Sequence, residues 1–257
     1  MQIIDRYAYT NNLRNVDPAY KAGFAAVVLV LCLLLDEPGV GLIASVWIWV
    51  LAVLVAGLPA AVFTRVLVGQ GIFLVLVTAG VAISISIADP SATNAWLWKL
   101  GPLWLSSGPE SLDYAAHIVT RALGATAAMT FLAMTTPLVD LLGLFRRMRV
   151  PVILIDVMTV MYRFIFVLFG SLDRMYVAQA SRLGYSSRRR SMVSAAQVGS
   201  RLFVDSYQRS QRLQTALDSR GYDGELRVLP SNYQRNNALF LAWLAVIASL
   251  FLVWRLL

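Results

Sequence analysis

Two arginines are placed where they could bind acidic or carbonyl groups of a partner protein. "ASRLGY" contains Arg182 and "DSRGY" contains Arg220, and each arginine follows a serine and precedes a glycine within two positions. Both stretches come after runs of helix formers, and Gly184 and Gly221 are typical of helix ends. The helix dipole stabilises an arginine at such an end, which accounts for one of them. Two matching ends, 38 residues apart, are better explained by a partner whose surface has two equivalent binding sites.

Few other residues are of a type that could catalyse a reaction or bind a metal ion. No G-x-x-x-x-G-K-[ST] phosphate loop occurs, so we do not expect the chain to hydrolyse ATP alone. Its one histidine, His117, and its one cysteine, Cys32, lie in separate apolar runs, and a single cysteine allows no intramolecular disulfide. Transition-metal sites need several such ligands. We therefore expect no catalytic residue, no metal site and no cofactor, and we interpret His117 as a packed helix residue.

The composition is that of an integral membrane protein. Of 257 residues, 58% are hydrophobic and 14% charged, whereas a soluble domain is about a quarter charged. The apolar residues form long runs, each near the length of about 20 residues that crosses a bilayer. Lipid offers no partner for an open backbone, so the predicted fold is all-α, with the β-branched run at 70–88 also helical. The candidate spans are 19–35, 39–57, 70–88, 114–136, 152–170 and 237–257.

A segment rich in tryptophan separates the third and fourth runs. Residues 89–113 contain Trp96, Trp98 and Trp104 among prolines and glycines. Tryptophan is enriched where a membrane meets water. The pattern predicts a loop or short helix at the interface, with the tryptophans as anchors and not as a ligand site.

Loop charges orient the spans, because basic loops stay in the cytoplasm. The segments 36–38 and 89–113 carry excess acid and are expected outside. The 58–69 loop contains Arg65 and the 137–151 loop contains three arginines, so both are expected inside, as is the weakly basic N-terminal segment. These assignments agree for four crossings.

The fifth apolar run does not fit a single crossing, because basic residues flank it on both sides. It also contains Asp156 and Arg163, seven residues apart and therefore on one helical face. A charge deep in a span is costly unless it is paired or wetted. We predict that 152–170 does not cross and instead begins a long cytoplasmic-side helix that ends at Gly184. Five crossings remain, and 237–257 is the last.

The segment 171–235 is strongly basic, with eleven arginines and five acidic residues. The positive-inside rule favours a cytoplasmic, membrane-apposed segment, and binding to anionic lipid or another polyanion stays open. Helical periodicity predicts a second helix over 192–220, after a turn at 186–191. The expected organisation is 1–136 with four transmembrane helices and the interfacial loop, 137–236 with the two cytoplasmic-side helices, and 237–257 with the last transmembrane helix.

Three blocks of the sequence carry a resemblance to a known family. "IDRYAYTNNLRNVDPAYK" contains Asp17-Pro18 and Lys21 before the first span. "TTPLVDLLGLFRRMRVPVILIDVMTVMYRFIFVL" contains Thr135-Thr136-Pro137, Pro151 and Tyr162-Arg163-Phe164. With the two arginine stretches, these blocks make nearly the whole chain resemble the transmembrane T component of energy-coupling factor transporters, most closely the cobalt/nickel branch (CbiQ type).

The resemblance gives the arginine stretches a role. The family carries two X-Arg-X motifs, often spelled Ala-Arg-Gly, and here they fall on Ser181-Arg182-Leu183 and Ser219-Arg220-Gly221. The first motif lacks the adjacent glycine and has Gly184 one position later. In the family the motifs insert into grooves on two ATP-binding subunits. The resemblance also implies supporting roles for Pro137, Pro151, Arg163 and Gly184.

The family further implies a non-catalytic, multi-pass subunit of the cell membrane. It couples two cytoplasmic ATPases to a separate membrane subunit that binds the substrate, possibly with a small accessory membrane subunit, and it binds no nucleic acid. ATP binding would change the angle between the two cytoplasmic-side helices. Their membrane-facing sides, about 152–178 and 195–214, would carry the substrate subunit. Small residues would allow close helix crossing there: Ala178, Ala180, Ala195, Ala196 and Gly199.

Three other functions compete with this interpretation. A T component for a vitamin would carry the same motifs. A membrane enzyme acting on lipid or polyprenyl phosphates would need an acidic metal-binding motif, which this sequence lacks. An ordinary importer permease would have one coupling helix instead of two motifs. Cobalt and nickel are not distinguished by the sequence.

Overall fold

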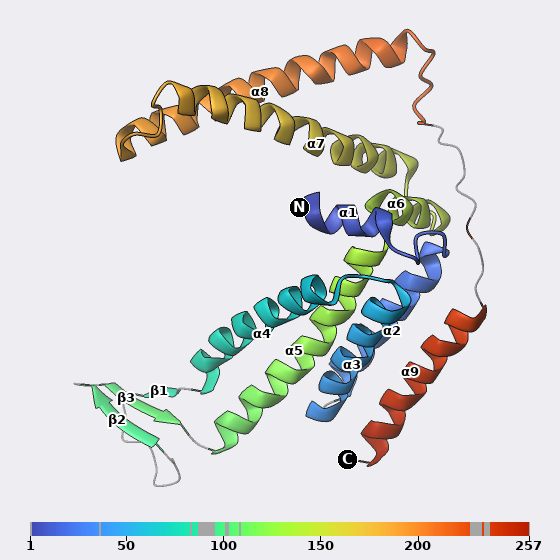
Figure 1. Ribbon diagram of the computed structural model, residues 1–257, viewed down its shortest axis with the longest axis vertical. Coiled ribbons are helices and arrows are strands. Elements are labelled where there is room, and N and C mark those ends of the chain that lie inside the picture. Colours follow the sequence, from blue (N-terminus) through green and yellow to red (C-terminus); the bar gives the residue numbers. More distant parts are fainter. Residues whose placement is uncertain are drawn as a thin grey trace. The chain divides into compact units, whose positions relative to one another are not determined.

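The computed structural model of the chain describes residues 2–35, 37–82, 84–86, 96–100, 103–107, 109–226, 233 and 237–256. The chain divides into two compact units (Figure 1). Unit 1 is Met1–Leu141 together with Ser231–Leu257, and unit 2 is Leu142–Pro230.

Unit 1 contains helices over five of the six apolar runs, as predicted, except that the helix of the run at 70–88 ends at Ala82. Asp17 caps the first of the long helices, because its side chain accepts a hydrogen bond of 3.0 Å from the Ala19 N–H, and Pro18 occupies the first helical position. The helices of this unit are α1 (Gln2–Thr10), α2 (Pro18–Leu34), α3 (Pro38–Val50) with a π-helical continuation at Leu51–Val55, α4 (Ala60–Ala82), α5 (Pro109–Thr135) and α9 (Asn237–Leu256).

Close backbone approach joins α2, α3 and α5, which lie side by side in Figure 1. A Cβ atom on Gly41 of α3 would fall against the Thr120 carbonyl of α5. A Cβ atom on Gly124 of α5 would lie 2.8 Å from the Cys32 sulfur of α2. Small residues at such contacts let apolar helices pack by van der Waals attraction, as expected inside a membrane.

Aromatic rings fill the space where α9 joins these helices. Phe24 of α2 stacks on Trp243 of α9 with ring centroids 5.1 Å apart, and it meets Phe131 of α5 edge-on at 5.9 Å. All three side chains are buried. The C-terminal helix is thereby part of the same core as the helices near the N-terminus.

A buried lysine ties the N-terminal segment to the end of α5. Lys21 is completely buried, and its Nζ donates to the carbonyls of Leu13 and Thr135 at 3.0 and 3.1 Å. The Asn11 amide also donates to the Thr135 carbonyl, at 3.2 Å. A cation among carbonyls at a helix C-terminus is favoured by the helix dipole. Lys21 and Thr135, both in the sequence blocks noted above, therefore meet in one contact.

The segment with three tryptophans differs from its prediction. Instead of a loop or short helix, it contains the strands β2 (Trp96–Leu100) and β3 (Leu103–Ser107). These strands pair antiparallel, and β1 (Ser84–Ser86) pairs with β3 on the other side. Antiparallel pairing supplies the backbone partners that a loop would leave open. Within the run at 70–88, α4 therefore ends at Ala82 and Ser84–Ser86 are strand.

Two predicted loops are largely helical. Arg65 lies inside α4 and not in a loop at 58–69, because the connection to that helix is short. The 137–151 loop contains α6 (Leu138–Arg147), which runs from unit 1 into unit 2. The prediction also missed α1, because a nine-residue polar helix gives no membrane signal.

Unit 2 consists mainly of two long helices, α7 (Val152–Ser181) and α8 (Arg188–Asp218). The first ends at Ser181, three residues before the predicted end. The second begins at Arg188, so the turn predicted at 186–191 is partly helix. Ser187 determines this start, because its side chain accepts a hydrogen bond of 3.3 Å from the Arg190 N–H.

By length and composition, four helices of the described chain could cross a membrane: Pro38–Val55, Ala60–Gly80, Asp113–Thr135 and Val152–Ser181. Pro18–Leu34 and Leu239–Arg255 are shorter apolar helices. The predicted polytopic helical membrane protein is confirmed. Since α7 is long and apolar enough to cross, its non-crossing assignment stays a prediction.

Candidate functional site

The first arginine motif is the capped end of α7. The Ser181 hydroxyl donates to the Val177 carbonyl, four residues back, at 2.8 Å. Leu183 is left-handed with φ 56°, and the Gly184 N–H donates to the Gln179 carbonyl at 2.9 Å. A left-handed residue with a bond reaching back five positions is the Schellman cap.

The second motif repeats this arrangement at the end of α8. The Ser219 hydroxyl donates to the Thr215 carbonyl at 2.7 Å. Gly221 is left-handed with φ 73°, and the Tyr222 N–H donates to the Leu217 carbonyl at 3.0 Å. Each position of the second cap therefore has its equivalent in the first, although the first has leucine where the second has glycine.

The cap itself is not special to the motifs. The end of α6 has the same form, with Arg149 left-handed at φ 62° and the Val150 N–H donating to the Phe145 carbonyl at 3.2 Å. There, however, Met148 occupies the position before the left-handed residue. Among these three ends, only those of α7 and α8 place a serine and an arginine ahead of it.

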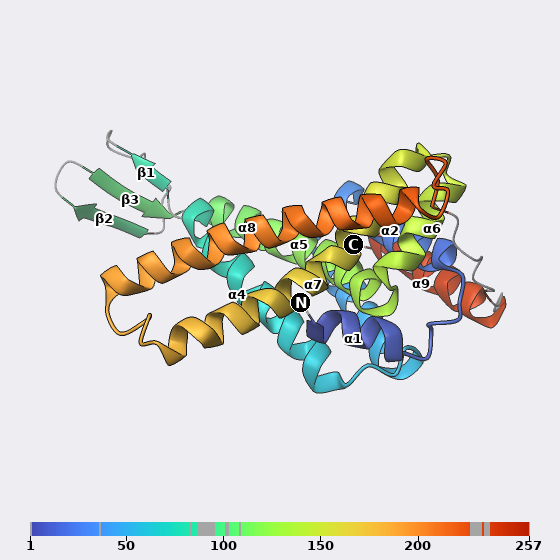
Figure 2. The ribbon, with the colours of Figure 1, turned by 90° about the horizontal axis from the view of Figure 1, so that it is seen from above.

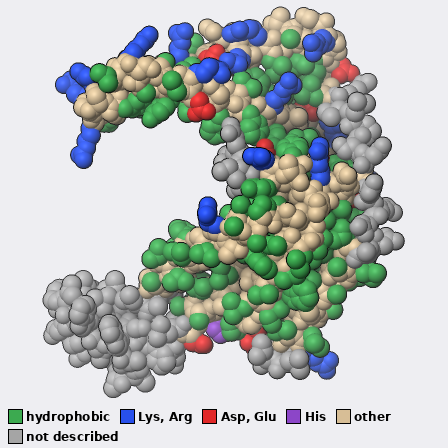
Figure 3. Space-filling model, viewed as in Figure 1, with side chains coloured by type: hydrophobic (Ala, Val, Ile, Leu, Met, Phe, Trp, Pro, Cys, Tyr) green, Lys and Arg blue, Asp and Glu red, His purple; other side chains and the backbone are tan. Residues whose placement is uncertain are grey.

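Both arginines are available to a partner. The six motif residues, Ser181, Arg182, Leu183, Ser219, Arg220 and Gly221, are all exposed. Leu183 is 68% exposed although it is apolar. Figure 3 shows arginine side chains reaching outward along unit 2. An exposed guanidinium offers five donors in a rigid fork, which suits carboxylates or carbonyls in a groove.

The two motifs lie at opposite ends of α8. Figures 1 and 2 both show α7 and α8 joined by a turn at one end, next to the first motif, with the second motif at the far end of α8. The 31 residues of α8 correspond to a length of about 45 Å. The pair could therefore engage two partner domains, one at each end.

A polar cluster joins the two helices where they cross. Ser171 of α7 is buried, and its hydroxyl accepts from Arg174 at 3.0 Å and from Arg209 of α8 at 3.3 Å. Arg209 also pairs with Asp205 at 3.0 Å. Sequence reasoning missed Ser171, because an isolated serine in a helix carries no signal of its partner.

A second contact holds the turn after the first motif against α8. The Ser194 hydroxyl donates to the Gly184 carbonyl at 3.0 Å, and Ser194 is buried. A Cβ atom on Gly184 would lie 2.5 Å from the Ser194 oxygen and 2.8 Å from the Gln179 carbonyl oxygen. Glycine is thus required at position 184 for close approach, while Leu183 adopts the left-handed conformation.

The remaining predicted support residues are Pro137, Pro151 and Arg163. Pro137 is buried between α5 and α6, and Pro151 occupies the N-cap position of α7 with φ −52° and ψ 132°. Arg163 is exposed on α7. Pro151 and Arg163 belong to unit 2 and precede the first motif by more than a dozen residues along α7, whereas Pro137 belongs to unit 1.

Asp156 is paired, but not with the residue on its own helix. It is 5% exposed, and it forms an ion pair with Arg146 of α6 at 3.3 Å. Its other oxygen accepts from the Leu226 N–H at 2.8 Å. The sequence grouped Asp156 with Arg163 through helical spacing, and could not show that both partners of Asp156 lie on other segments.

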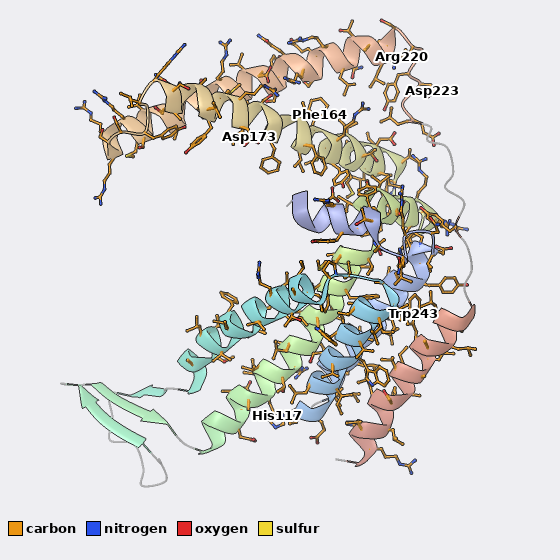
Figure 4. The ribbon with its side chains drawn as sticks, in the orientation of Figure 1. His117, Phe164, Asp173, Arg220, Asp223 and Trp243 are labelled. Carbon is orange, nitrogen blue, oxygen red and sulfur yellow. The ribbon has the colours of Figure 1, made fainter. Side chains whose placement is uncertain are left out.

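His117 and Cys32 belong to unit 1, whereas both motifs belong to unit 2. His117 is in α5 (Figure 4), 3.7 Å from Asp113, which is four residues away on the same helix. Cys32 is buried in α2. Within the described part of the chain, no group of three or more His, Cys, Asp or Glu side chains is placed to hold a metal ion.

Comparison with known proteins gives a consistent result. Residues 10–230 match the CbiQ family, described as Cobalt transport protein. Uncharacterized protein MJ1089 of Methanocaldococcus jannaschii is 30% identical over 230 residues, which are 88% of this chain and 83% of that protein. Cobalt transport protein CbiQ of Rhodobacter capsulatus is 41% identical over 133 residues, 52% of this chain and 54% of that protein. Energy-coupling factor transporter transmembrane protein EcfT of Staphylococcus aureus is 26% identical over 129 residues, 43% and 46% of the two chains.

Proposed function

This chain belongs to the CbiQ family of cobalt transport proteins, in the cobalt/nickel branch of the energy-coupling factor T components, and we propose that it couples two ATPase subunits to uptake of cobalt or nickel ions. It is a multi-pass membrane protein of a transport system. In this role it is non-catalytic. The ATPases hydrolyse ATP, and a separate membrane subunit, possibly with a small accessory subunit, binds the metal ion.

The observation that carries this proposal is the pair of matched helix ends. Arg182 and Arg220 each follow a serine bonded to the carbonyl four residues back, and each precedes a left-handed residue. A helix dipole explains why an arginine is stable at either end, but not why two exposed ends place a serine and an arginine at the same two positions of the cap. Two equal ATPase subunits would offer two equal grooves.

One exposed face of α8 suits a membrane partner. Met192, Phe203 and Tyr207 fall within a narrow stripe of α8 and are 75%, 73% and 57% exposed. The small residues Ala196 and Gly199 lie on the same stripe and are exposed too. An exposed apolar stripe of this kind marks an interaction site. We assign it to the substrate-binding subunit, with small residues allowing close helix approach.

The helix pair could transmit motion as two levers. The turn after α7 is held by the Ser194 hydroxyl, and the crossing is held by the Ser171 cluster. Motion of the ATPases would pull the two motifs at the opposite ends. Because α7 and α8 are long, a small change of their crossing angle would displace their ends by several ångströms, which would tilt the substrate-binding subunit.

Replacing both arginines tests the proposal directly. Arg182→Glu and Arg220→Glu reverse the charge that faces the partner's acidic or carbonyl groups, and a reversed charge in a desolvated groove costs several kcal/mol. We expect the double variant to lose the ATPases on detergent pull-down, by at least tenfold, while it still inserts and still binds the membrane subunit. Arg212→Glu, at an exposed arginine elsewhere on α8, is the matched control and should retain the ATPases.

Lysine variants refine the test. Lysine keeps the charge but loses the planar fork, so Arg182→Lys and Arg220→Lys should be partly tolerated. Full ATPase recovery with normal metal uptake by the double glutamate variant would mean that these arginines are only helix caps, and the coupling role would be abandoned.

A further inference from the structure

The chain beyond the second motif returns to the start of α7 and is held there. The Leu226 N–H donates to Asp156 Oδ2 at 2.8 Å. The Leu226 carbonyl accepts from Arg146 Nη2 at 3.3 Å, and the same nitrogen pairs with Asp156 Oδ1 at 3.3 Å. We call Arg146, Asp156 and Leu226 the clasp. All three residues belong to unit 2.

The hydrogen bonds and the ion pair of the clasp make it a stable contact. The Asp156 side chain is 7% exposed, and each of its oxygens has a partner. Arg146 is 34% exposed and joins both of the other members. A buried carboxylate is stable only when it is paired and hydrogen-bonded, so removing either partner leaves an uncompensated charge. The segment around Leu226 is therefore fixed by a contact that is costly to break.

The clasp lies a short chain length from Arg220. The cap of α8 ends where the Tyr222 N–H reaches the Leu217 carbonyl, and only Asp223, Gly224 and Glu225 separate Tyr222 from Leu226. Four residues span about 14 Å when fully extended. We call residues 223–225 the strap. Figure 4 shows Arg220 and Asp223 at the point where α8 ends and the strap begins. The second motif cannot move farther from the start of α7 than the strap allows.

The two motifs thus differ in what holds them. The first is fixed by the turn between α7 and α8, which the Ser194 hydroxyl fastens. The second lies about 45 Å away along α8, at an end that no further helix follows within the described residues of unit 2. From the geometry of the clasp, we propose that Asp156 is a positioning residue for the second motif: through Leu226 it holds Arg220 at a defined place relative to α6 and α7. This rests on the coupling function proposed above.

Hydrogen exchange tests the clasp without any ATPase. Asp156→Ala removes both bonds to the carboxylate, whereas Leu226→Pro removes the donor N–H and keeps the Arg146 and Asp156 side chains that form the ion pair. In the full chain in lipid nanodiscs, both should raise amide exchange over 217–225 at least tenfold. Asp173→Ala, at an exposed acid on α7 (Figure 4), is the control and should leave exchange unchanged. Unchanged exchange in Leu226→Pro would overturn the proposal even if Asp156→Ala misfolds.

Recovery of the ATPases on pull-down tests whether the clasp positions the second motif. Each measurement is made in a background in which the arginine of one motif has been replaced. In the Arg182→Glu background the ATPases depend on the second motif, so Leu226→Pro or Asp156→Ala should lower ATPase recovery at least fivefold. In the Arg220→Glu background the same changes should alter recovery less than twofold. Equal effects in both backgrounds would overturn the positioning role. Normal docking by every arginine variant would overturn the proposed function itself, whereas the exchange result depends on the clasp alone.

Discussion

Leu183 and Gly221 occupy the same left-handed position in the caps of α7 and α8, with φ of 56° and 73°. Only glycine adopts this conformation without a cost, which for other residues is about 1–2 kcal/mol. The chain accepts that cost at Leu183 and avoids it at Gly221. The arginine before each residue is presented by the same backbone geometry, so the spelling of the motif matters less than its shape.

Because the two caps are equivalent, we expect substitutions of Gly221 to lower stability by an amount that depends on the side chain introduced. Gly221→Leu copies the residue of the first motif and should lower stability by about 1 kcal/mol while ATPase docking persists. Gly221→Val should be worse, because a β-branched residue is a true outlier at positive φ. Thermal unfolding and ATPase pull-down would measure both effects. Equal tolerance of leucine and valine would contradict the equivalence of the two caps.

Gly184 should tolerate no side chain, for a different reason. A Cβ atom there would meet the Ser194 oxygen at 2.5 Å and the Gln179 carbonyl at 2.8 Å. Gly184→Ala is therefore expected to push the turn off α8 and to weaken docking at the first motif severalfold. Because Ser194→Ala removes only one of the two clashing atoms, the double variant should recover docking in part. Full docking by Gly184→Ala alone would show that this contact is dispensable.

The non-crossing assignment of α7 can be checked by labelling in intact cells. Single cysteines at Asp173 and Ser187, both exposed, should be protected from an impermeant reagent, because arginine-rich segments stay in the cytoplasm. A cysteine at Glu37 should be labelled. Cys32→Ala provides the cysteine-free background, and permeabilised cells should label all three positions. External labelling at Asp173 would show that the α7 assignment is wrong.

The metal ion is expected to be independent of His117 and Cys32. Transition-metal sites need several ligands, and these two residues are the only histidine and cysteine of the chain. His117→Ala and Cys32→Ala should therefore leave the metal content of the assembled complex unchanged, as measured by elemental analysis. Loss of metal from an otherwise intact complex would place part of the substrate site on this chain.

Local patterns predicted much of the structure. The apolar runs predicted the long helices, because lipid forces a backbone to satisfy its own hydrogen bonds. The glycines at 184 and 221 placed the ends of α7 and α8 within three residues, since a helix cap is built from neighbouring residues. The family blocks and the two arginines were visible for the same reason: each is a short, contiguous signal.

Contacts between distant segments were decided by the tertiary structure alone. The sequence placed Asp156 on one helical face with Arg163, but the partners of its carboxylate include Arg146 and the backbone of Leu226, 70 residues away. Lys21 likewise found its carbonyl partner on Thr135, 114 residues away. A buried charge takes whichever partner the packed helices bring within reach, and no periodicity along the chain encodes that distance. For this reason the two arginine motifs could be read from the sequence, whereas the clasp beside the second one required the fold.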